Sequence, residues 1–256
     1  MLGNIAEATS DGKSDYNALW VTYTKHYSSG LQLDATYTWS RSLDFNSLSS
    51  QGVVVQNSYN VMGDWGLSDF NASHRFVLDG TYELPFKGNP IVRGWRLGTI
   101  MQFQTGNPFN INTINGALSG YFNSRPTVLG PVVTTLGSAP DGNPKYVFAN
   151  ACTTPTAGCS LLIPGTFGDL GRNALIGPGF ADVDASIAKD FHFLERYMLE
   201  FRVDAFDMLN HPNFGQPNRF LSTSPTSTFG EITSTRFPVG DSGSSRQLQM
   251  SLDLQF

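Results

Sequence analysis

The stretch Leu31-Gln32-Leu33-Asp34-Ala35-Thr36-Tyr37-Thr38-Trp39-Ser40 has an apolar or aromatic residue at every odd position and a polar residue at every even one. An alternation with a period of two directs successive side chains to opposite faces of a β-sheet. The pattern therefore predicts a β-strand over residues 30–41 with one apolar face and one polar face.

Six other segments show the same alternation, most clearly the last one, in which Leu248, Met250, Leu252, Leu254 and Phe256 interleave with polar residues. Strands of soluble proteins usually have about five or six residues, whereas a strand tilted across a bilayer needs about 9 to 11. The predicted strands lie near the longer value, which favours a membrane β-barrel. They are residues 16–27, 30–41, 74–84, 95–105, 181–190, 197–209 and 246–256.

The polar faces of these strands carry charges that a barrel would direct into a wet lumen. The apolar faces carry Tyr37, Trp39, Trp95, Tyr197 and Phe256 near strand ends, as in the aromatic girdles of membrane barrels. The predicted fold class is all-β, a segment of an antiparallel transmembrane β-barrel with long extracellular loops. The predicted lumen-facing residues are Asp34, Asp79, Glu83, Arg96, Glu200, Arg202, Asp204 and Asp253.

The connections between the predicted strands alternate between short turns and long loops, the long ones being residues 42–73, 106–180 and 210–245. Outer-membrane barrels have short periplasmic turns and long extracellular loops, so we expect Phe256 on the periplasmic side and residues 1–15 outside. Single-chain bacterial barrels close with even strand numbers from about eight upward. Seven strands, with no signal peptide in front, therefore indicate that residues 1–256 are the C-terminal portion of a larger barrel, without its plug domain.

A second interpretation stays open. In this interpretation, residues 52–56 or 229–233 would add a further strand, and a small barrel would close by itself. A third is a soluble secreted β-sandwich that binds carbohydrate, in which Leu31, Leu33, Leu252 and Leu254 would meet in a dry core between two sheets.

The composition excludes other classes of protein. The chain of 256 residues has 16 Lys and Arg against 21 Asp and Glu, a formal net charge of −5, so it offers no basic surface for nucleic acid. No apolar run approaches the roughly 18 residues of a membrane-spanning helix. Cys152 and Cys159, the two cysteines of the chain, have no neighbouring histidine, which disfavours a metal site and predicts a small disulfide loop.

Nothing in the sequence predicts an enzyme, a metal centre or a cofactor. Gly240-Asp241-Ser242-Gly243 resembles the nucleophile turn of trypsin-like proteases, but Ser244 follows and no histidine has a matching context, so we interpret it as a chance match. Glu200, Arg202 and Asp204 share a face. We expect them to form a lumen-facing ladder that pairs with Asp184 and Asp253, or with a plug, rather than an acid/base array.

Several short phrases together resemble the barrel of Oar-like TonB-dependent outer-membrane receptors, and the resemblance runs almost from end to end. Besides the alternating stretch that opens this section, they are Tyr16-Asn17-Ala18-Leu19, Ser68-Asp69-Phe70, His74-Arg75-Phe76-Val77, Thr105-Gly106-Asn107-Pro108-Phe109, Gly171-Arg172-Asn173, Gly177-Pro178-Gly179-Phe180 and Asn210-His211-Pro212-Asn213-Phe214-Gly215. Phe256 and the alternation before it are similar to the terminal signal that the barrel assembly machinery recognises.

The resemblance implies a full protein with a signal peptide, a plug domain and a barrel of about 22 strands. It implies uptake of a substrate across the outer membrane, powered by periplasmic TonB, with outer-membrane lipid, the assembly machinery and the plug as partners. In this family this chain would supply wall and ligand-facing loops. A closed small barrel acting as an anchor or adhesin is the alternative. Aromatic and amide side chains in the loops are the candidates for ligand contact, although the same residues would also serve to pack the loops: Trp65, Phe70, Tyr121, Phe122, Asn123 and Tyr146.

Overall fold

Seven long β-strands dominate the computed structural model, as the alternation predicts. They are β1 (Ser14–Ser28), β2 (Leu31–Asp44), β4 (His74–Glu83), β5 (Trp95–Gln104), β14 (Phe180–Phe193), β15 (Tyr197–Phe206) and β17 (Gln247–Gln255). The structure describes residues 10–48, 55–113, 124–132, 135–147, 151–152, 154–156, 159–163, 167–193, 197–222, 224, 226–236 and 245–256.

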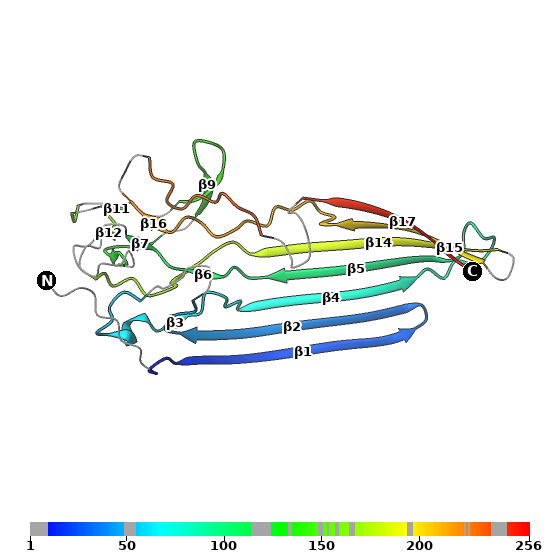
Figure 1. Cartoon of the computed structure of the whole chain (residues 1–256), viewed down its shortest axis with the longest axis horizontal. Coiled ribbons are helices and arrows are strands. Elements are labelled where there is room, and N and C mark those ends of the chain that lie inside the picture. The colour runs from blue at the N-terminus through cyan, green and yellow to red at the C-terminus, as the bar shows by residue number, and fades with distance from the viewer. Residues whose placement is uncertain are drawn as a thin grey trace.

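The seven strands form one antiparallel sheet in chain order, β1-β2-β4-β5-β14-β15-β17, which we call the wall (Figure 1). The short strand β3 (Gly66–Leu67) extends this sheet by pairing with the end of β2. Among the described residues β1 pairs only with β2 and β17 only with β15, so the sheet is not closed.

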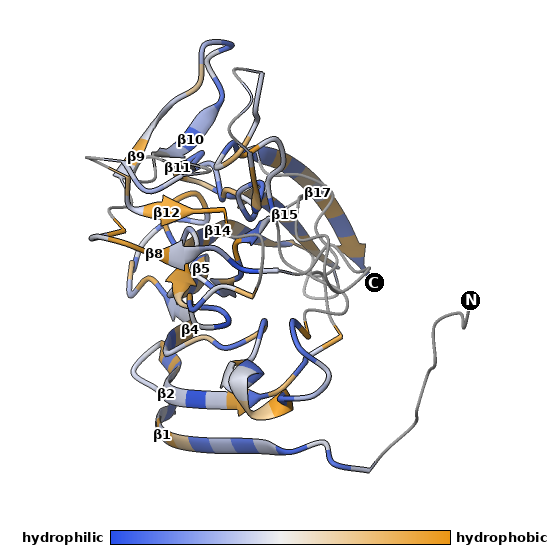
Figure 2. Ribbon diagram, turned by 90° about the vertical axis from the view of Figure 1, so that its left-hand side faces the viewer, coloured by the Kyte–Doolittle hydropathy of each residue, from blue (hydrophilic) through white to orange (hydrophobic). Residues whose placement is uncertain are grey.

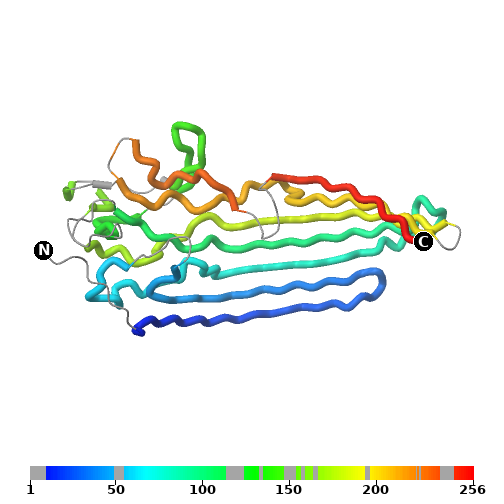
Figure 3. Tube along the Cα trace, in the orientation of Figure 1, coloured from blue at the N-terminus to red at the C-terminus, as the bar shows by residue number. Residues whose placement is uncertain are grey.

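The two ends of the wall differ. Short connections join β1 to β2 and β4 to β5 at one end, the turn end, where the C-terminus also lies (Figures 1 and 3). The other end, the loop end, carries the long connections, whose described residues we call the loop cap. The cap contains the 3-10 helix η1 (Val61–Asp64) and, besides β3, the strands β6 (Pro108–Phe109), β7 (Asn112–Thr113), β8 (Thr127–Val128), β9 (Thr135–Ser138), β10 (Pro144–Val147), β11 (Ala151–Cys152), β12 (Leu161–Leu162), β13 (Leu175–Ile176) and β16 (Phe220–Leu221).

The first turn differs by one residue from the expected Ser28-Ser29. Ser28 pairs with Leu31, and the turn consists of Ser29 and Gly30, with φ of 54° and 82°. Two residues with positive φ make the type I′ turn that matches the twist of a hairpin. A side chain at Gly30 would also meet the carbonyl oxygen of Glu83 at 2.7 Å, so glycine is required there.

Three strand ends also depart from expectation. β2 continues to Asp44 because Leu43 and Asp44 pair with β3, a pairing that alternation alone does not reveal. β14 continues to Phe193, which pairs with Tyr197. β15 stops at Phe206 rather than at residue 209, because Asp207 has a positive φ of 45° and begins a turn.

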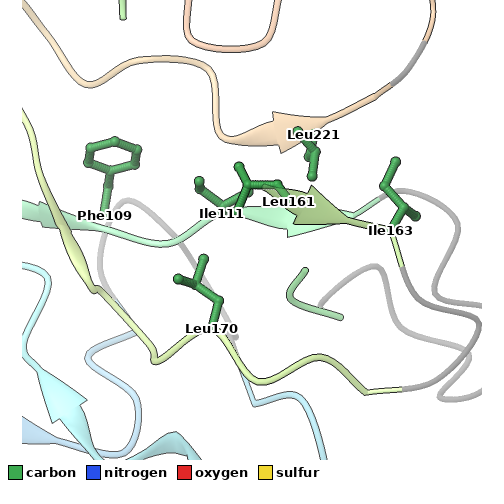
Figure 4. Close-up of a cluster of buried hydrophobic side chains, with 6 residues drawn as sticks. All are labelled: Phe109, Ile111, Leu161, Ile163, Leu170 and Leu221. Carbon is green, nitrogen blue, oxygen red and sulfur yellow. The ribbon is translucent and has the colours of Figure 1, made fainter. Parts of the chain in front are cut away.

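The apolar face of the wall is exposed, and alternation is visible as hydropathy stripes along β17 (Figure 2). Leu252 and Leu254 are 68% and 50% exposed, so the dry inter-sheet core that a β-sandwich requires is absent around them. The main cluster of buried apolar residues lies in the loop cap instead and is shown in Figure 4. Its members are Phe109, Ile111, Leu161, Ile163, Leu170 and Leu221.

In the described ranges no helix has the length and apolar character to cross a membrane.

Candidate functional site

The strand register places all the charged residues predicted to face a lumen on the polar face of the wall. Asp34, Asp79 and Asp184 lie in one row of this face, on β2, β4 and β14, with Ile100 of β5 between Asp79 and Asp184. Glu83, Arg96 and Arg202 are linked through Ala188 in one row, and Glu200 faces Asp253 in the next. Asp204 lies opposite Ser186 on the same face. That this face lines a lumen stays a prediction.

The charged ladder pairs differently from the expectation. Arg96 reaches across the strand β14, donating from Nη2 to Glu200 Oε2 at 2.5 Å. Arg202 binds Asp204 two residues along its own strand, at 2.7 Å. Asp184, an expected partner of the ladder, accepts a hydrogen bond from the backbone N–H of Asp207 at 2.9 Å. This hydrogen bond shows that Asp184 helps to hold the end of β15.

Small residues make room for the Arg96 side chain. Gly98, Ser186 and Ala188 occupy the polar face beside it, and a cavity of about 190 Å³ lies over them. A side chain at Gly98 would meet Ser186 Oγ at 2.4 Å. The cavity is edged by both carboxylates and guanidinium groups, which suits water or a polar occupant rather than an apolar one.

A buried charge cluster, absent from the sequence predictions, holds the loop cap together. Arg125 pairs with Asp64, and Arg172 pairs with Asp44 and lies 3.5 Å from Asp69. All five side chains are almost or wholly buried. Burying a charge is costly unless it is paired and hydrogen-bonded, so the five groups depend on one another.

Backbone groups complete the coordination of both arginines. Arg172 Nε donates to the carbonyl of Asp64 at 2.8 Å, and Arg125 Nε donates to that of Leu170 at 2.7 Å. Gln56 adds to the cluster, because its Oε1 accepts from the N–H of Arg125 at 2.6 Å and its Nε2 donates to Gly168. The cluster therefore joins segments of the first two long connections of the chain.

The family-like phrases form joints of this cap. In Gly171-Arg172-Asn173, Asn173 has a φ of 52° and donates from Nδ2 to Asp69 at 2.8 Å and to the carbonyl of Leu67 at 2.6 Å. Asn213 clamps Ala181 from both sides, accepting from its N–H at 2.8 Å and donating to its carbonyl at 3.0 Å. Asn107 donates to the carbonyl of Asn71 at 3.1 Å. Asn107 and Asn173 therefore join segments of the loop cap to one another, and Asn213 joins the cap to β14.

The described ligand candidates lie in three different settings. Trp65 packs edge-on against Phe45, with ring centroids 5.0 Å apart, so it contributes to loop packing. Phe70 is 61% exposed. Tyr146 packs beside Phe109, and burial raises the pKa of its hydroxyl. Tyr121, Phe122 and Asn123 lie outside the described residues.

A larger cavity, which we call the hairpin cavity, lies between the wall and the hairpin of β9 and β10. Its volume is about 600 Å³. Its wall side is formed by Tyr37, Phe76 and Phe103, which occupy one row of the apolar face. Leu136 and Tyr146 line it from the hairpin. At the rim, Tyr37 Oη lies 2.7 Å from His74 Nδ1. The sequence did not predict this cavity, because the residues of the hairpin and of the wall that line it are far apart in the chain.

The other residues singled out in the sequence lie in different parts of the chain. Cys159 is disulfide-bonded, while the side chain of Cys152 lies outside the described part, so their pairing stays a prediction. Phe256 is 95% exposed at the turn end. The Gly240–Gly243 phrase lies outside the described residues. Within the described ranges, no cluster of three or more His, Cys, Asp or Glu side chains is arranged to hold a metal ion.

Comparison with known families agrees with a wall that has an apolar face exposed to its surroundings and a charged face on the opposite side. Residues 1–249 match the family model of the outer membrane beta barrel domain. The chain belongs to this family. An outer membrane beta barrel domain is located in the outer membrane, as the strand lengths predict. No curated protein and no solved structure shows significant similarity to the chain.

Proposed function

We propose that this outer membrane beta barrel domain is the C-terminal wall portion of an Oar-like TonB-dependent receptor, which takes up a substrate across the outer membrane. The wall would enclose part of the lumen, and the loop cap would face the ligand outside. Periplasmic TonB would act on the plug domain of the parent protein. We propose no enzymatic role for the chain.

The observation that carries the proposal is the two-faced wall. Large apolar side chains are exposed on six of the seven strands, for example Leu19 on β1 and Met250 on β17, and those of β4, such as Leu78, are half-buried. A contiguous apolar surface of this extent is unfavourable in water and favourable against lipid. The opposite face carries Asp34, Asp79, Arg96 and Glu200, groups suited to a water-filled or plugged interior.

Strand direction supports a barrel larger than this chain. Seven strands in an antiparallel order leave β1 and β17 running in the same direction, from the loop end to the turn end. These two edges do not pair with each other in antiparallel fashion, and an odd number of further strands is needed for closure. The roughly 22 strands of large outer-membrane transporters satisfy this condition.

The alternative, a small self-closing barrel that anchors adhesive loops, requires an eighth strand in the wall. Two segments were candidates for this strand. One of them, residues 229–233, lies in the loop cap, where the backbone of Glu231 forms an isolated β-bridge with Lys145 and the N–H of Ile232 donates to the carbonyl of Pro144. Residues 52–54 lie outside the described residues, and Val55 and Gln56 are not in a strand. The open edges favour the larger barrel.

The size of the native protein tests the proposal. An antiserum against this chain is used to probe an outer-membrane fraction on a denaturing gel, and the gene is sequenced upstream of the Met1 codon. We expect a protein several times larger than 28.0 kDa, with a plug domain and a signal peptide. A mature outer-membrane protein of 28.0 kDa would contradict the proposal and support the self-closing barrel.

Uptake is tested separately by photo-crosslinking in cells. A crosslinker placed in the N-terminal segment of the parent protein should capture TonB, and deletion of the plug should abolish capture while the wall still reaches the outer membrane. Failure of TonB capture from the intact parent would remove the transport part of the proposal.

A further inference from the structure

We propose that the hairpin cavity binds the acyl chain of an outer-leaflet lipid, and that the β9–β10 hairpin holds this lipid against the wall. This inference rests on the outer-membrane location of the chain and not on TonB-dependent transport. The two proposals can therefore fail independently.

The floor of the cavity is a continuation of the lipid-facing surface. Tyr37, Phe76, Phe103 and Ala181 form one row across β2, β4, β5 and β14. The next row toward the turn end consists of Ala35, Leu78, Met101 and Val183, all apolar and on the same face. Hydrocarbon that covers the second row therefore reaches the first without crossing a polar surface.

The cavity lies at the depth where a lipid changes from acyl chain to headgroup. Its rim residues Tyr37 and His74 are at the loop end of the apolar face, beside Trp39, which pairs with His74 in the strand register. Aromatic residues in this position form the interfacial girdle of a barrel. The polar groups at the rim are thus next to headgroups, and the apolar floor is next to acyl chains.

The hairpin turns this part of the wall into an open groove that is covered on one side. In Figure 2, β9 and β10 lie on the outer side of the arc formed by β5, β14 and β15. Leu136 is 57% exposed and lines the cavity from β9. The hairpin is held in place by its own contacts, since Tyr146 donates its N–H to the carbonyl of Gly230 at 2.8 Å. A volume of about 600 Å³ is within the range of about 300–1,000 Å³ typical of small-ligand cavities.

Position within the wall keeps the site available in a larger barrel. The floor strands β2, β4, β5 and β14 are internal to the sheet, and the open edges are β1 and β17. Strands added at these edges would not cover the row from Tyr37 to Ala181. An outer-leaflet lipid is therefore the occupant with direct access.

The first experiment locates the lipid by photolabelling. The native outer-membrane protein that contains this chain is reconstituted in vesicles with a phospholipid that has a photoactivatable acyl chain, and labelled peptides are identified by mass spectrometry. Peptides with Leu78 and Met101 should be labelled as ordinary lipid-facing wall. The specific expectation is additional labelling of the β9–β10 hairpin at Leu136, which a hairpin projecting into water would not show.

Two variants and a matched control test the cavity itself. Ala181→Trp fills the floor, and Leu136→Asp places a charge on the hairpin side. The control, Ala35→Trp, adds the same bulk to the same face one row outside the cavity. Hairpin labelling should fall about tenfold in both cavity variants, a change equivalent to 1.4 kcal/mol. It should stay unchanged in the control.

The folding of each variant is checked first. A variant is folded and inserted if its migration on an unheated gel and the labelling of Leu78 and Met101 are unaltered. With that established, a hairpin that is unlabelled in the wild-type protein overturns the proposal. So does equal labelling in Ala181→Trp and Ala35→Trp, because the hairpin would then be meeting bulk lipid. Binding of a soluble apolar peptide in place of lipid also overturns it.

Discussion

The wall and the loop cap solve opposite packing problems with the same chain. The wall exposes leucine, methionine and aromatic side chains on one face and keeps Arg96 and Glu200 on the other. The loop cap buries Phe109, Ile111 and Leu161 in a core and encloses ion pairs, as soluble domains do. The difference teaches that burial in this molecule is defined relative to two solvents, lipid for the wall and water for the cap.

The largest effect should come from breaking the buried charge cluster. Arg172→Met removes the cation that pairs with Asp44 and lies beside Asp69, and the two buried carboxylates keep only their other partners, which costs about 3–5 kcal/mol of local stability. Hydrogen exchange should accelerate at the amides of Ser68 and Asn71 in the cap. The amides of β4 and β5 should keep their protection.

A compensating variant sharpens this prediction. Adding Asp44→Asn and Asp69→Asn to Arg172→Met removes the stranded charges and should restore part of the protection. If Arg172→Met alone left the exchange of the cap unchanged, the cluster would have no structural role. If it also released the wall strands, cap and wall would be one cooperative unit.

The second effect concerns the wall. Leu252→Arg places a charge on the apolar face of β17, and we expect a loss of about 2–4 kcal/mol if the residue is near the middle of the bilayer. Reversible unfolding in vesicles measures this loss. Leu252→Ala is the control and should cost much less, because Leu252 is not part of a packed protein core. Comparable losses for the two variants would mean that the face is packed against protein.

A smaller effect is expected at the ion pair of the polar face. Glu200→Gln removes the carboxylate that accepts from Arg96, while both side chains stay partly exposed. Partly exposed pairs contribute about 0–1 kcal/mol, and salt screens them. Unfolding measured at low and high salt should differ between wild type and variant only at low salt. A loss above that range would place the pair in a dry environment.

The smallest effect is a pH dependence of the β9–β10 turn. The backbone N–H of Asn143 donates to Asp141 at 3.1 Å and holds the pKa of that carboxyl below its ordinary value. A lowered pKa in the folded state stabilises the turn at pH above the ordinary aspartate value. This contribution is lost as the pH falls through the lowered pKa. The protection of the Asn143 amide against exchange, relative to its intrinsic rate, should therefore fall in acid. Asp141→Asn should abolish this pH dependence of the protection.

The wall was predictable from sequence because its signal is local. Residues 31–40 carry their strand, its two faces and its length in ten consecutive positions. Where the alternation failed, the cause is a strand pairing or a backbone conformation that alternation does not encode. The end of β2 depends on β3, and the end of β15 depends on the backbone conformation of Asp207.

The loop cap was not predictable in the same way, because its interactions are long-range. Arg172 finds Asp44 at a separation of 128 residues, and Arg125 finds Asp64 at 61. Nothing near Arg172 in the sequence indicates that its charge is buried. The Gly171-Arg172-Asn173 phrase was a usable signal only as a resemblance, and the physical reason for it appears with the fold. The hairpin cavity likewise depends on contacts between distant segments.

Two lysines on the apolar face have a consequence for how the wall sits in the membrane. Lys189 lies between Trp95 and Phe191 and donates to the carbonyl of Pro90 at 2.8 Å, and Lys25 reaches Ser28. Both ammonium groups thus turn toward the turn end, away from the hydrocarbon. A shift of the wall toward its loop end, along the membrane normal, would draw these charges into the acyl chains. We therefore expect the two lysines to oppose such a shift and so to limit the depths at which the wall is stable in the membrane.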